Sequence, residues 1–361
     1  MKKEGEGFFR TAIGLAVLLA AAALFWQSQR PVNEALPEPT SGEIEGASSI
    51  SAFFGPPSAQ AAARLQGGAD EELVAAIDLA ETRVEAALYD LNLWTVRDAL
   101  IEAHRRGVQV RVVMEADQAH RSEVIDLVEA GIPVNYDDRP PLMHHKFIVI
   151  DGRWVWTGSM NWTLNGVYRN DNNVVVIDSP DMAANFSTEF AEMFEADRFG
   201  ELSLADTPYP FLVIGEAGVE TAFAPEDGVL ARILRSLDRA ERSIDVLAFV
   251  FTSDPIAEAL LAAERRGVRV RGVFEAKRVG DLGSDVNRLR EAGLSMRLDT
   301  NPNTMHHKVI LIDGRLVITG SYNFTRSAEE RNDENLLLID SEELFGLYQH
   351  EFERLYQAAL P

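Results

Sequence analysis

The chain contains no cysteine among its 361 residues, so disulfide bonds cannot contribute to its stability. Hydrophobic residues, 46% of the total, must build the core, and a chain of this length can form two well-buried lobes. The lack of cysteine is compatible with several compartments and does not place the protein in the cell.

Positive charge is also scarce. The chain has 34 lysines and arginines against 57 aspartates and glutamates, a net charge of −23. Such a surface repels polyanions and weakens salt-dependent binding to a phosphate backbone, and no long basic patch offsets it. The composition therefore disfavours an extended nucleic-acid surface, although it leaves room for a local basic funnel at a site.

Lysine is almost absent from residues 31 to 361, which contain only Lys146, Lys277 and Lys308. Two of the three stand in a repeated stretch. The sequence MHHKFIVIDGRWVWTGSMNWT (143 to 163) returns as MHHKVILIDGRLVITGSYNFT (305 to 325). A chain that otherwise uses arginine has kept lysine in both copies, which indicates a chemical role.

Both copies share one pattern: His, any residue, Lys, four residues, Asp, six residues, and then Gly-Ser-any-Asn. Two matched copies predict one active site built from two halves. A lone buried His and Lys would more simply satisfy each other within a strand, but the matched copies disfavour that interpretation. The motif residues are His144, Lys146, Asp151, Gly158, Ser159 and Asn161 in the first copy, and His306, Lys308, Asp313, Gly320, Ser321 and Asn323 in the second.

The apolar, β-branched runs after the histidines predict buried strands that enter Asp-Gly hairpins. Side chains alternate between the faces of a strand, so His144 and Lys146 share one face. The second copy pairs His306 with Lys308 in the same way. The predicted working pairs are these two.

The other motif residues have simpler predicted roles. Asp151 and Asp313 occupy the first turn position, where aspartate tolerates the backbone conformation and bonds to nearby amides, so we expect structural roles. We expect His145 and His307, on the reverse faces, to pack or form hydrogen bonds.

An imidazole can attack phosphorus or deliver a proton near neutral pH, while an ammonium group and an asparagine amide can hold phosphoryl oxygens. Two copies supply a nucleophile, an acid and two such clamps, the amides being those of Asn161 and Asn323. No carboxylate cluster of metal-ligand type accompanies them, so charge neutralisation falls to Lys146 and Lys308. We expect a site that uses neither a metal nor a cofactor.

With its duplicated HxKxxxxD motif followed by GSxN, the sequence resembles the phospholipase D superfamily over about residues 48 to 358. The resemblance implies two αβαβα halves packed face to face, with both motifs at their junction. It also implies a covalent phosphohistidine intermediate that water or an alcohol resolves. Many members carry one motif and dimerise, whereas this chain looks like a fused pair that could function as a monomer.

The two halves differ at one matched position downstream of the motif histidine, where the first has Asn172 and the second Glu334. In the family that the chain resembles, an acidic residue near this place bonds the other ring nitrogen of the histidine. A carboxylate raises the pKa of an imidazole, so pairing within each half would make His306 the general acid and His144 the nucleophile.

The duplication extends beyond the motifs. AHRRGVQVRVVMEA (103 to 116) matches AERRGVRVRGVFEA (263 to 276), and VEAALYDL (84 to 91) matches IDVLAFVF (244 to 251). Alternating strands and amphipathic helices predict two α/β domains with central sheets. The resemblance to the phospholipase D superfamily implies that the two lobes are related by a pseudo-twofold axis and that each is a mixed sheet flanked by helices. The predicted parts are a membrane anchor or signal segment (1 to 30), a flexible linker (31 to 47), and two lobes (48 to 205 and 206 to 361).

The amino-terminal segment contains an uncharged run from residue 11 to 26, preceded by Lys2, Lys3 and Arg10. Its length suits either the apolar region of a signal peptide or a short membrane span. The flanking charges and Trp26 favour an uncleaved anchor with the catalytic body outside the cytoplasm. The alternative is a secreted or periplasmic protein after signal cleavage.

Three functions remain open. The first is a phospholipase D type phosphodiesterase acting on a membrane phospholipid, which the anchor and the acidic surface favour. The second is a metal-independent endonuclease acting on DNA or RNA, because residues 251 to 270 look much like the small bacterial nuclease branch of the superfamily. The third, a catalytically silent binding module, is disfavoured by the intact motifs.

Overall fold

The computed structural model describes residues 49 to 360. The predicted anchor (1 to 30) and linker (31 to 47) lie outside the described residues. None of the helices between residues 49 and 360 combines the length and the hydrophobicity that a membrane span requires.

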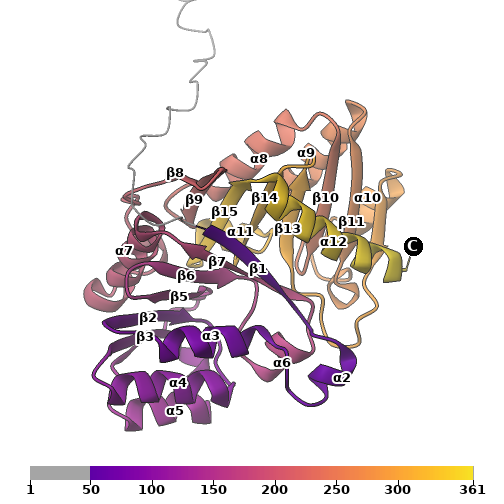
Figure 1. Cartoon of the computed structure of the whole chain (residues 1–361). Coiled ribbons are helices and arrows are strands. Elements are labelled where there is room, and N and C mark those ends of the chain that lie inside the picture. Colours follow the sequence, from indigo (N-terminus) through magenta and orange to yellow (C-terminus); the bar gives the residue numbers. More distant parts are fainter. Residues whose placement is uncertain (1–48, 361) are drawn as a thin grey trace, which may run out of the picture. The chain divides into compact units, whose positions relative to one another are not determined.

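The first lobe is built on a mixed sheet of seven strands (Figure 1). The strands are β1 (Ser49–Gly55), β2 (Arg83–Leu88), β3 (Gln109–Glu115), β4 (Val134–Asp137), β5 (Lys146–Ile150), β6 (Trp154–Gly158) and β7 (Asn172–Asp178). Their order is β1-β7-β6-β5-β2-β3-β4. β2, β3 and β4 run parallel to one another, whereas the remaining neighbours are antiparallel.

The second lobe repeats this sheet and adds one edge strand. Its strands are β8 (Phe211–Ile214), β9 (Ala217–Ala224), β10 (Ser243–Ala248), β11 (Arg269–Phe274), β12 (Ser295–Leu298), β13 (Lys308–Ile312), β14 (Leu316–Gly320) and β15 (Glu334–Asp340). The order β12-β11-β10-β13-β14-β15-β9-β8 matches that of the first lobe, with β8 as the extra strand. The predicted lobe boundary near residue 205 falls in the connection that leads into β8.

Helices cover both faces of each sheet. They are α2 (Ala59–Ala62), α3 (Ala69–Asp78), α4 (Trp94–Arg105), α5 (Ser122–Glu129), α6 (Leu164–Tyr168), α7 (Pro180–Ala196), α8 (Val229–Arg239), α9 (Asp254–Arg265), α10 (Val286–Glu291), α11 (Arg326–Glu330) and α12 (Glu342–Ala358), with the short 3₁₀ helices η1 (Ala116–Gln118), η2 (Gly200–Leu202) and η3 (Ala276–Arg278). In Figure 1, α3, α4 and α5 lie together on the outer side of the first lobe, and α8 and α9 take the corresponding place in the second. The predicted pair of αβαβα lobes is confirmed.

The innermost hydrophobic cluster belongs to both lobes. It joins Val149 of β5 and Phe186 of α7 to Phe223 of β9, Leu337 of β15 and Phe352 of α12, all of them buried. Two further clusters fill the outer face of each sheet beneath its own helices. Because apolar burial is the dominant favourable term in folding, the shared cluster fixes the two lobes against each other as one body.

Two isolated β-bridges join the lobes beside the motifs. Met143 bridges to Asp333, and the pseudo-equivalent bridge joins Asp171 to Met305. In the first, His144 N donates to Asp333 O at 2.9 Å, and in the second, His306 N donates to Asp171 O at 2.8 Å. These bonds tie the backbone of each motif histidine to the opposite lobe.

The motif strands turn as the sequence predicts. Asp151 and Gly152 join β5 to β6 with φ values of 53° and 61°, and Asp313 and Gly314 join β13 to β14 with φ values of 56° and 83°. Arg153 N donates to Ile150 O and Arg315 N to Ile312 O, so each Asp-Gly pair occupies the two central positions of a tight turn, whose positive φ angles it adopts with little strain. The predicted hairpins are therefore confirmed.

Candidate active site

The two motif pairs lie at the beginning of matching strands, one in each lobe. Lys146 opens β5 and Lys308 opens β13, each with its histidine two positions earlier. All four side chains are at least nine-tenths buried, with His144 at 6% and His306 at 8% exposure. Lys308 Nζ lies 3.3 Å from His306 Nε2. Burial lowers the pKa of His306, and the charges of Lys308, Lys146 and His144 lower it further, as expected for groups that lie close together.

The partners of the histidines cross between the lobes. His144 Nδ1 lies 2.9 and 2.8 Å from the two carboxylate oxygens of Glu334, whereas His306 Nδ1 lies 2.9 Å from Asn172 Oδ1. The expectation that Glu334 pairs with His306 in its own half is therefore wrong. The assignment of His306 as the acid because of a carboxylate partner fails with it, since the carboxylate belongs to His144. Pairing within a half and pairing across the pseudo-twofold share the same sequence spacing, and the two bridges place each partner beside the opposite histidine.

The motif serines hold these partners in place. Ser321 Oγ donates to Glu334 Oε2 at 2.7 Å, and Ser159 Oγ donates to Asn172 Oδ1 at 3.0 Å. Ser159 also offers its backbone carbonyl to His306 Nδ1 at 3.0 Å. Each GSxN motif thus positions the residue that serves the histidine of the other lobe.

These contacts fix the ring tautomers. A carbonyl oxygen only accepts, so His306 Nδ1 must carry the proton and donate it to Ser159 O. Ionised Glu334 likewise accepts from His144 Nδ1. Both Nε2 atoms then carry the lone pair of the neutral ring, and that of His306 accepts from Lys308 Nζ.

Burial shapes the ionisation of the cluster. It holds the pKa of His144 well below its usual value, assisted by the charges of Lys146 and Lys308. Burial also raises the pKa of Glu334 to about 7 and lowers the pKa of Lys146 to about 7. An arriving anion would favour the protonated forms of the lysines and of His306, because an opposite charge stabilises the charged form.

The lysines bond the backbone of their own motifs, and the motif asparagines keep a polar atom without a partner among the described residues. Lys146 Nζ donates to His144 O at 2.5 Å, and Lys308 Nζ donates to His306 O at 2.9 Å. The Oδ1 atoms of Asn161 and Asn323 are buried and have no hydrogen-bond partner in the described part of the chain. Rotation of either side-chain amide by 180° exchanges its oxygen and its NH₂ group, so each amide can accept a hydrogen bond from a ligand or donate one to it.

Asp151 and Asp313 make contacts of the structural kind that their turn position predicts. Asp151 accepts from the backbone amides of Glu81, Thr82 and Arg83 at 2.7 to 3.0 Å, and Asp313 does the same with residues 241 to 243. Despite the opposing effect of partial burial, those amide bonds hold the pKa of both carboxyl groups below its usual value. Neither side chain reaches the histidines.

Sequence reasoning missed two aromatic rings beside the histidines. The Tyr89 ring lies 4.9 Å from that of His144 and the Phe249 ring 4.6 Å from that of His306, between ring centroids. The two lysines lie over the same rings, Lys146 Nζ at 4.9 Å from Tyr89 and Lys308 Nζ at 5.1 Å from Phe249. Both rings occupy the sixth position of the repeat at 84 to 91 and 244 to 251, which is the signal that could have revealed them.

Two glutamates were also missed. Glu115 and Glu275 accept from the backbone N–H of Met143 and Met305 at 3.0 and 2.7 Å, and so anchor the residue before each motif histidine. They stand at matched places in the repeated MEA and FEA sequences.

The second histidine of each motif points into the shared core, as the strand alternation predicts. His145 Nε2 lies 3.0 Å from Glu189 Oε1 of α7, and His307 Nε2 lies 3.2 Å from Glu351 Oε1 of α12. Against the effect of burial, Arg354 and the hydrogen bond from His307 lower the pKa of Glu351 to about 2. Within residues 49 to 360 no arginine takes this place beside Glu189, whose pKa burial raises well above its usual value.

Glu226 adds a second carboxyl group near Glu189, and we expect it to lower the stability of the folded state. Burial, and then Glu189, raise its pKa to about 10 from 4.5. A carboxyl group whose pKa is higher in the folded state than in the unfolded state makes its full contribution to stability only below the unfolded-state pKa of about 4.5. This contribution is lost as the pH rises from 4.5 toward 10. Glu226→Gln should therefore raise the free energy of unfolding by about 1–3 kcal/mol at pH 8 and by much less at pH 5. Denaturant titrations at both pH values measure this, with the exposed Glu216→Gln as control. Equal changes for both variants would refute the assignment.

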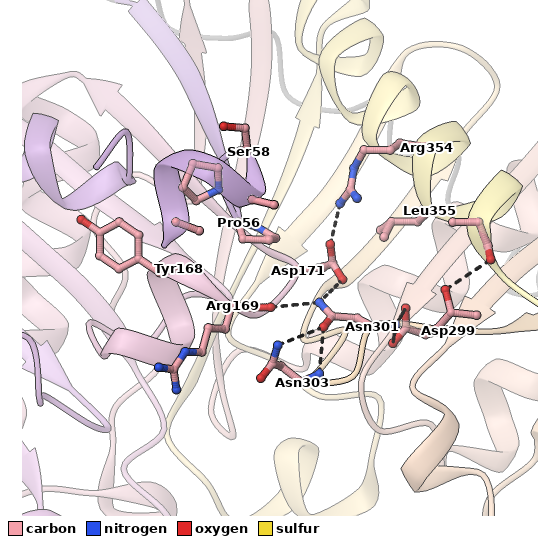
Figure 2. A pocket seen from close by; sticks show the side chains of 15 residues that line it. Pro56, Ser58, Tyr168, Arg169, Asp171, Asp299, Asn301, Asn303, Arg354 and Leu355 are labelled. Atoms are coloured by element: carbon pink, nitrogen blue, oxygen red, sulfur yellow. Dashed lines mark hydrogen bonds and ion pairs between the residues drawn. The ribbon is translucent and has the colours of Figure 1, made fainter. Parts of the chain in front are cut away.

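A cavity of about 710 Å³ opens at the lobe junction next to Asp171. Figure 2 shows Asp171 held between Arg354 and Asn301, which donate to it at 2.5 and 2.7 Å. At the pseudo-equivalent Asp333, Gly200 N of the interlobe connection donates to the carboxylate at 2.5 Å.

Known proteins match most of the chain. The model of the family described as "Cardiolipin synthase, PLD-like domain" matches residues 73–194 and 233–356, one match in each lobe. A mitochondrial cardiolipin hydrolase of Xenopus tropicalis is 40% identical over 131 residues, which are 36% of this chain and 62% of that protein. A phospholipase D of Rickettsia prowazekii (strain Madrid E) is 37% identical over 147 residues, covering 40% of this chain and 72% of that protein.

The chain spans between 57% and 67% of the length of the mitochondrial cardiolipin hydrolases that it matches. A solved structure, the phosphatidylserine synthase of Haemophilus influenzae Rd KW20, aligns over 86% of each chain with a TM-score of 0.61 and 14% identity, which shows a shared two-lobed fold. With one family match per lobe and a relative of 37% identity, the chain belongs to the family of cardiolipin synthase, PLD-like domains.

Proposed function

We propose that the protein is a phospholipase D type phosphodiesterase that cleaves the phosphodiester bond of a phospholipid through a covalent phosphohistidine. The observation that carries the proposal is the pair of buried His-Lys sets, each with its histidine oriented by a residue of the opposite lobe. The names of the relatives, cardiolipin hydrolase and phospholipase D, support the same reaction class.

In the first step, His144 is the nucleophile. Glu334 accepts a hydrogen bond from the Nδ1–H group of His144, so the lone pair of the ring lies on Nε2. The same carboxylate stabilises the positive charge that the ring gains on attack. The Nε2–P bond forms as the bond from phosphorus to the head-group oxygen breaks. His306, whose Nδ1 has only carbonyl and amide oxygens as partners, is protonated when the anionic substrate binds and gives its Nε2 proton to the leaving oxygen.

In the second step, water or an alcohol gives a proton to His306 Nε2 and attacks phosphorus, and the P–Nε2 bond breaks. Water yields phosphatidic acid and an alcohol yields a new phosphodiester. Lys146, Lys308, Asn161 and Asn323 hold the two non-bridging oxygens throughout, and the positive charge of the lysines supplies the stabilisation that a metal provides in other phosphodiesterases.

The predicted anchor and the net charge of −23 favour a lipid over a polyanion as substrate. We therefore propose association with a membrane and a catalytic body outside the cytoplasm. Since both motifs occur in one chain, a monomer carries a complete set of catalytic groups. Cleavage of DNA or RNA is the second candidate, on the sequence likeness of residues 251 to 270 to small bacterial nucleases.

The test is incubation of the full chain, in detergent and excess chelator, with mixed phospholipids plus ethanol and, separately, with single- and double-stranded nucleic acids. We expect phosphatidic acid and phosphatidylethanol to form at the same rate with and without chelator. The double variant His144→Asn/His306→Asn is the control for contaminating activity. Cleavage of nucleic acid without lipid turnover would replace the proposal with the nuclease, and loss of activity in chelator would refute the metal-independent mechanism.

A further inference from the structure

Arg354 of α12 holds two buried carboxylates at once. Its Nη2 donates to Asp171 Oδ1 at 2.5 Å and to Glu351 Oε1 at 2.7 Å, and its Nε donates to Glu351 Oε2 at 2.8 Å. Asp171 is 2% exposed and Glu351 is 5% exposed. Because a buried carboxylate is costly unless it is paired, this guanidinium stabilises both charges inside the fold.

The two carboxylates connect this guanidinium to the second motif. Asp171 accepts from His306 N through its backbone carbonyl at 2.8 Å, and the next residue, Asn172, places its Oδ1 2.9 Å from His306 Nδ1. Glu351 Oε1 lies 3.2 Å from His307 Nε2. The Asp171 branch therefore leads to the catalytic histidine, whereas the Glu351 branch leads to the histidine that points into the core.

The Asp171 carboxylate has a second donor, which is uncharged. Asn301 Nδ2 donates to Asp171 Oδ2 at 2.7 Å from the loop between β12 and β13 (Figure 2). Only Arg354 brings an opposite charge, whose attraction adds to its hydrogen bond because screening is weak inside a protein. Arg354 is therefore the stronger constraint on the position of Asp171.

The first lobe is built differently at the matching place. Three residues beyond the glutamate that bonds the second histidine of the motif, α7 has Glu192 where α12 has Arg354. Asp333, the pseudo-equivalent of Asp171, accepts instead from Arg139 Nη2 at 2.5 Å, and Arg139 lies in the loop between β4 and β5. The two halves of the site therefore depend on different arginines.

We infer that Arg354 is a positioning residue for His306, the acid of the proposed mechanism. It acts through Asp171, whose bridge to Met305 and whose neighbour Asn172 fix the backbone and the ring of the histidine. The inference rests on the proposed function, in which this histidine protonates the leaving oxygen and then accepts a proton from water. Proton transfer depends steeply on geometry, since a misplacement of about 1 Å can lower a rate roughly 10²-fold.

The expected effect of losing Arg354 depends on the leaving group. In the first step an alkoxide needs the proton of His306, whereas a nitrophenolate leaves without one. In the second step His306 accepts a proton from water, whichever group has left. A misplaced His306 should therefore slow the first step for an alkoxide only and the second step for both kinds of ester. A general loss of folded enzyme would instead lower both rates for both esters by one factor.

The experiment compares phosphatidylglycerol with phosphatidyl-4-nitrophenol, two esters of the same charge, in neutral detergent micelles with the full-length chain. We expect Arg354→Gln to lower the ratio of kcat/KM for the glycerol ester to that for the nitrophenyl ester about ten-fold, a part of the roughly 10²- to 10⁴-fold that a general acid contributes. With the nitrophenyl ester, kcat and KM should fall together, because kcat/KM reports the first step and kcat the slower second step. Arg354→Lys keeps the charge but lacks the fork that reaches two carboxylates, so its ratio should lie between those of the wild type and Arg354→Gln.

Three further variants separate the branches. Asp171→Asn should lower the ratio as Arg354→Gln does, whereas Glu351→Gln, which breaks the branch to His307, should leave the ratio unchanged. Arg139→Gln acts on the side of the nucleophile, which both esters need, so it should lower both kcat/KM values and keep their ratio.

The wild type separates failure of the positioning role from failure of the proposed function. If the wild type cleaves both esters and the ratio is unchanged in Arg354→Gln or in Asp171→Asn, the positioning role is overturned and the proposed function stays intact. Cleavage of the nitrophenyl ester alone by the wild type would show that His306 does not serve an alkoxide, which also refutes the positioning role. Absence of turnover of either ester by the wild type would overturn the proposed function and the positioning role together.

Discussion

Replacement of His144 by Asn is expected to lower kcat/KM for lipid cleavage by about four orders of magnitude or more, because the chain then lacks its nucleophile. Asn keeps a polar group near Glu334 but has no lone pair that can displace an alkoxide from phosphorus. The measurement is release of head group from a labelled phospholipid, compared with wild type at equal folded concentration. Retention of more than a small fraction of the activity would remove the phosphohistidine mechanism.

His306→Asn should differ from His144→Asn in one revealing way. With a phosphodiester that has a good leaving group, such as a nitrophenolate, protonation by His306 is unnecessary and the first step proceeds. The second step lacks its base, so the covalent intermediate accumulates. Mass spectrometry of the quenched protein should then find the phosphoryl group on His144. A label elsewhere, or none in this variant, would contradict the assignment of the nucleophile.

Glu334→Gln is expected to lower kcat/KM about 10²- to 10³-fold and to change its pH dependence. Because burial raises the pKa of Glu334 to about 7, the carboxylate that accepts from His144 is lost as pH falls through this value. Lys146, whose pKa burial lowers to about 7, loses its charge as pH rises. The wild type should therefore show a bell-shaped profile, whose two limbs report the coupled cluster rather than single residues. The variant should keep the basic limb and lose the acidic one.

Glu189→Gln is the matched control for this prediction. Glu189 also bonds a motif histidine, His145, but on the reverse face of β5 and at a residue to which we assign no chemistry. Since burial raises the pKa of Glu189 well above its usual value, the neutral amide resembles the carboxyl group that it replaces. The control should keep both limbs of the profile. An acidic limb that survives in Glu334→Gln would show that another group controls the nucleophile.

The sequence alone sufficed for every feature that depends on local pattern. Alternation along a strand separated the working face of His144 from the core face of His145, and the structure bears this out, because His145 bonds α7 within the shared core. The Asp-Gly pairs predicted the two hairpins, whose backbone angles these residues adopt with little strain. Matching sequence segments predicted two lobes of the same fold, because a repeat of this length encodes the same strands and helices twice.

Only the tertiary structure decided which group serves which histidine. Asn172 and Glu334 follow their own histidines at the same spacing, so the sequence cannot distinguish a partner in the same lobe from one in the other. The lobes pack so that Asp171 bridges to Met305 and Asp333 to Met143, and the next residue on each strand then meets the opposite histidine.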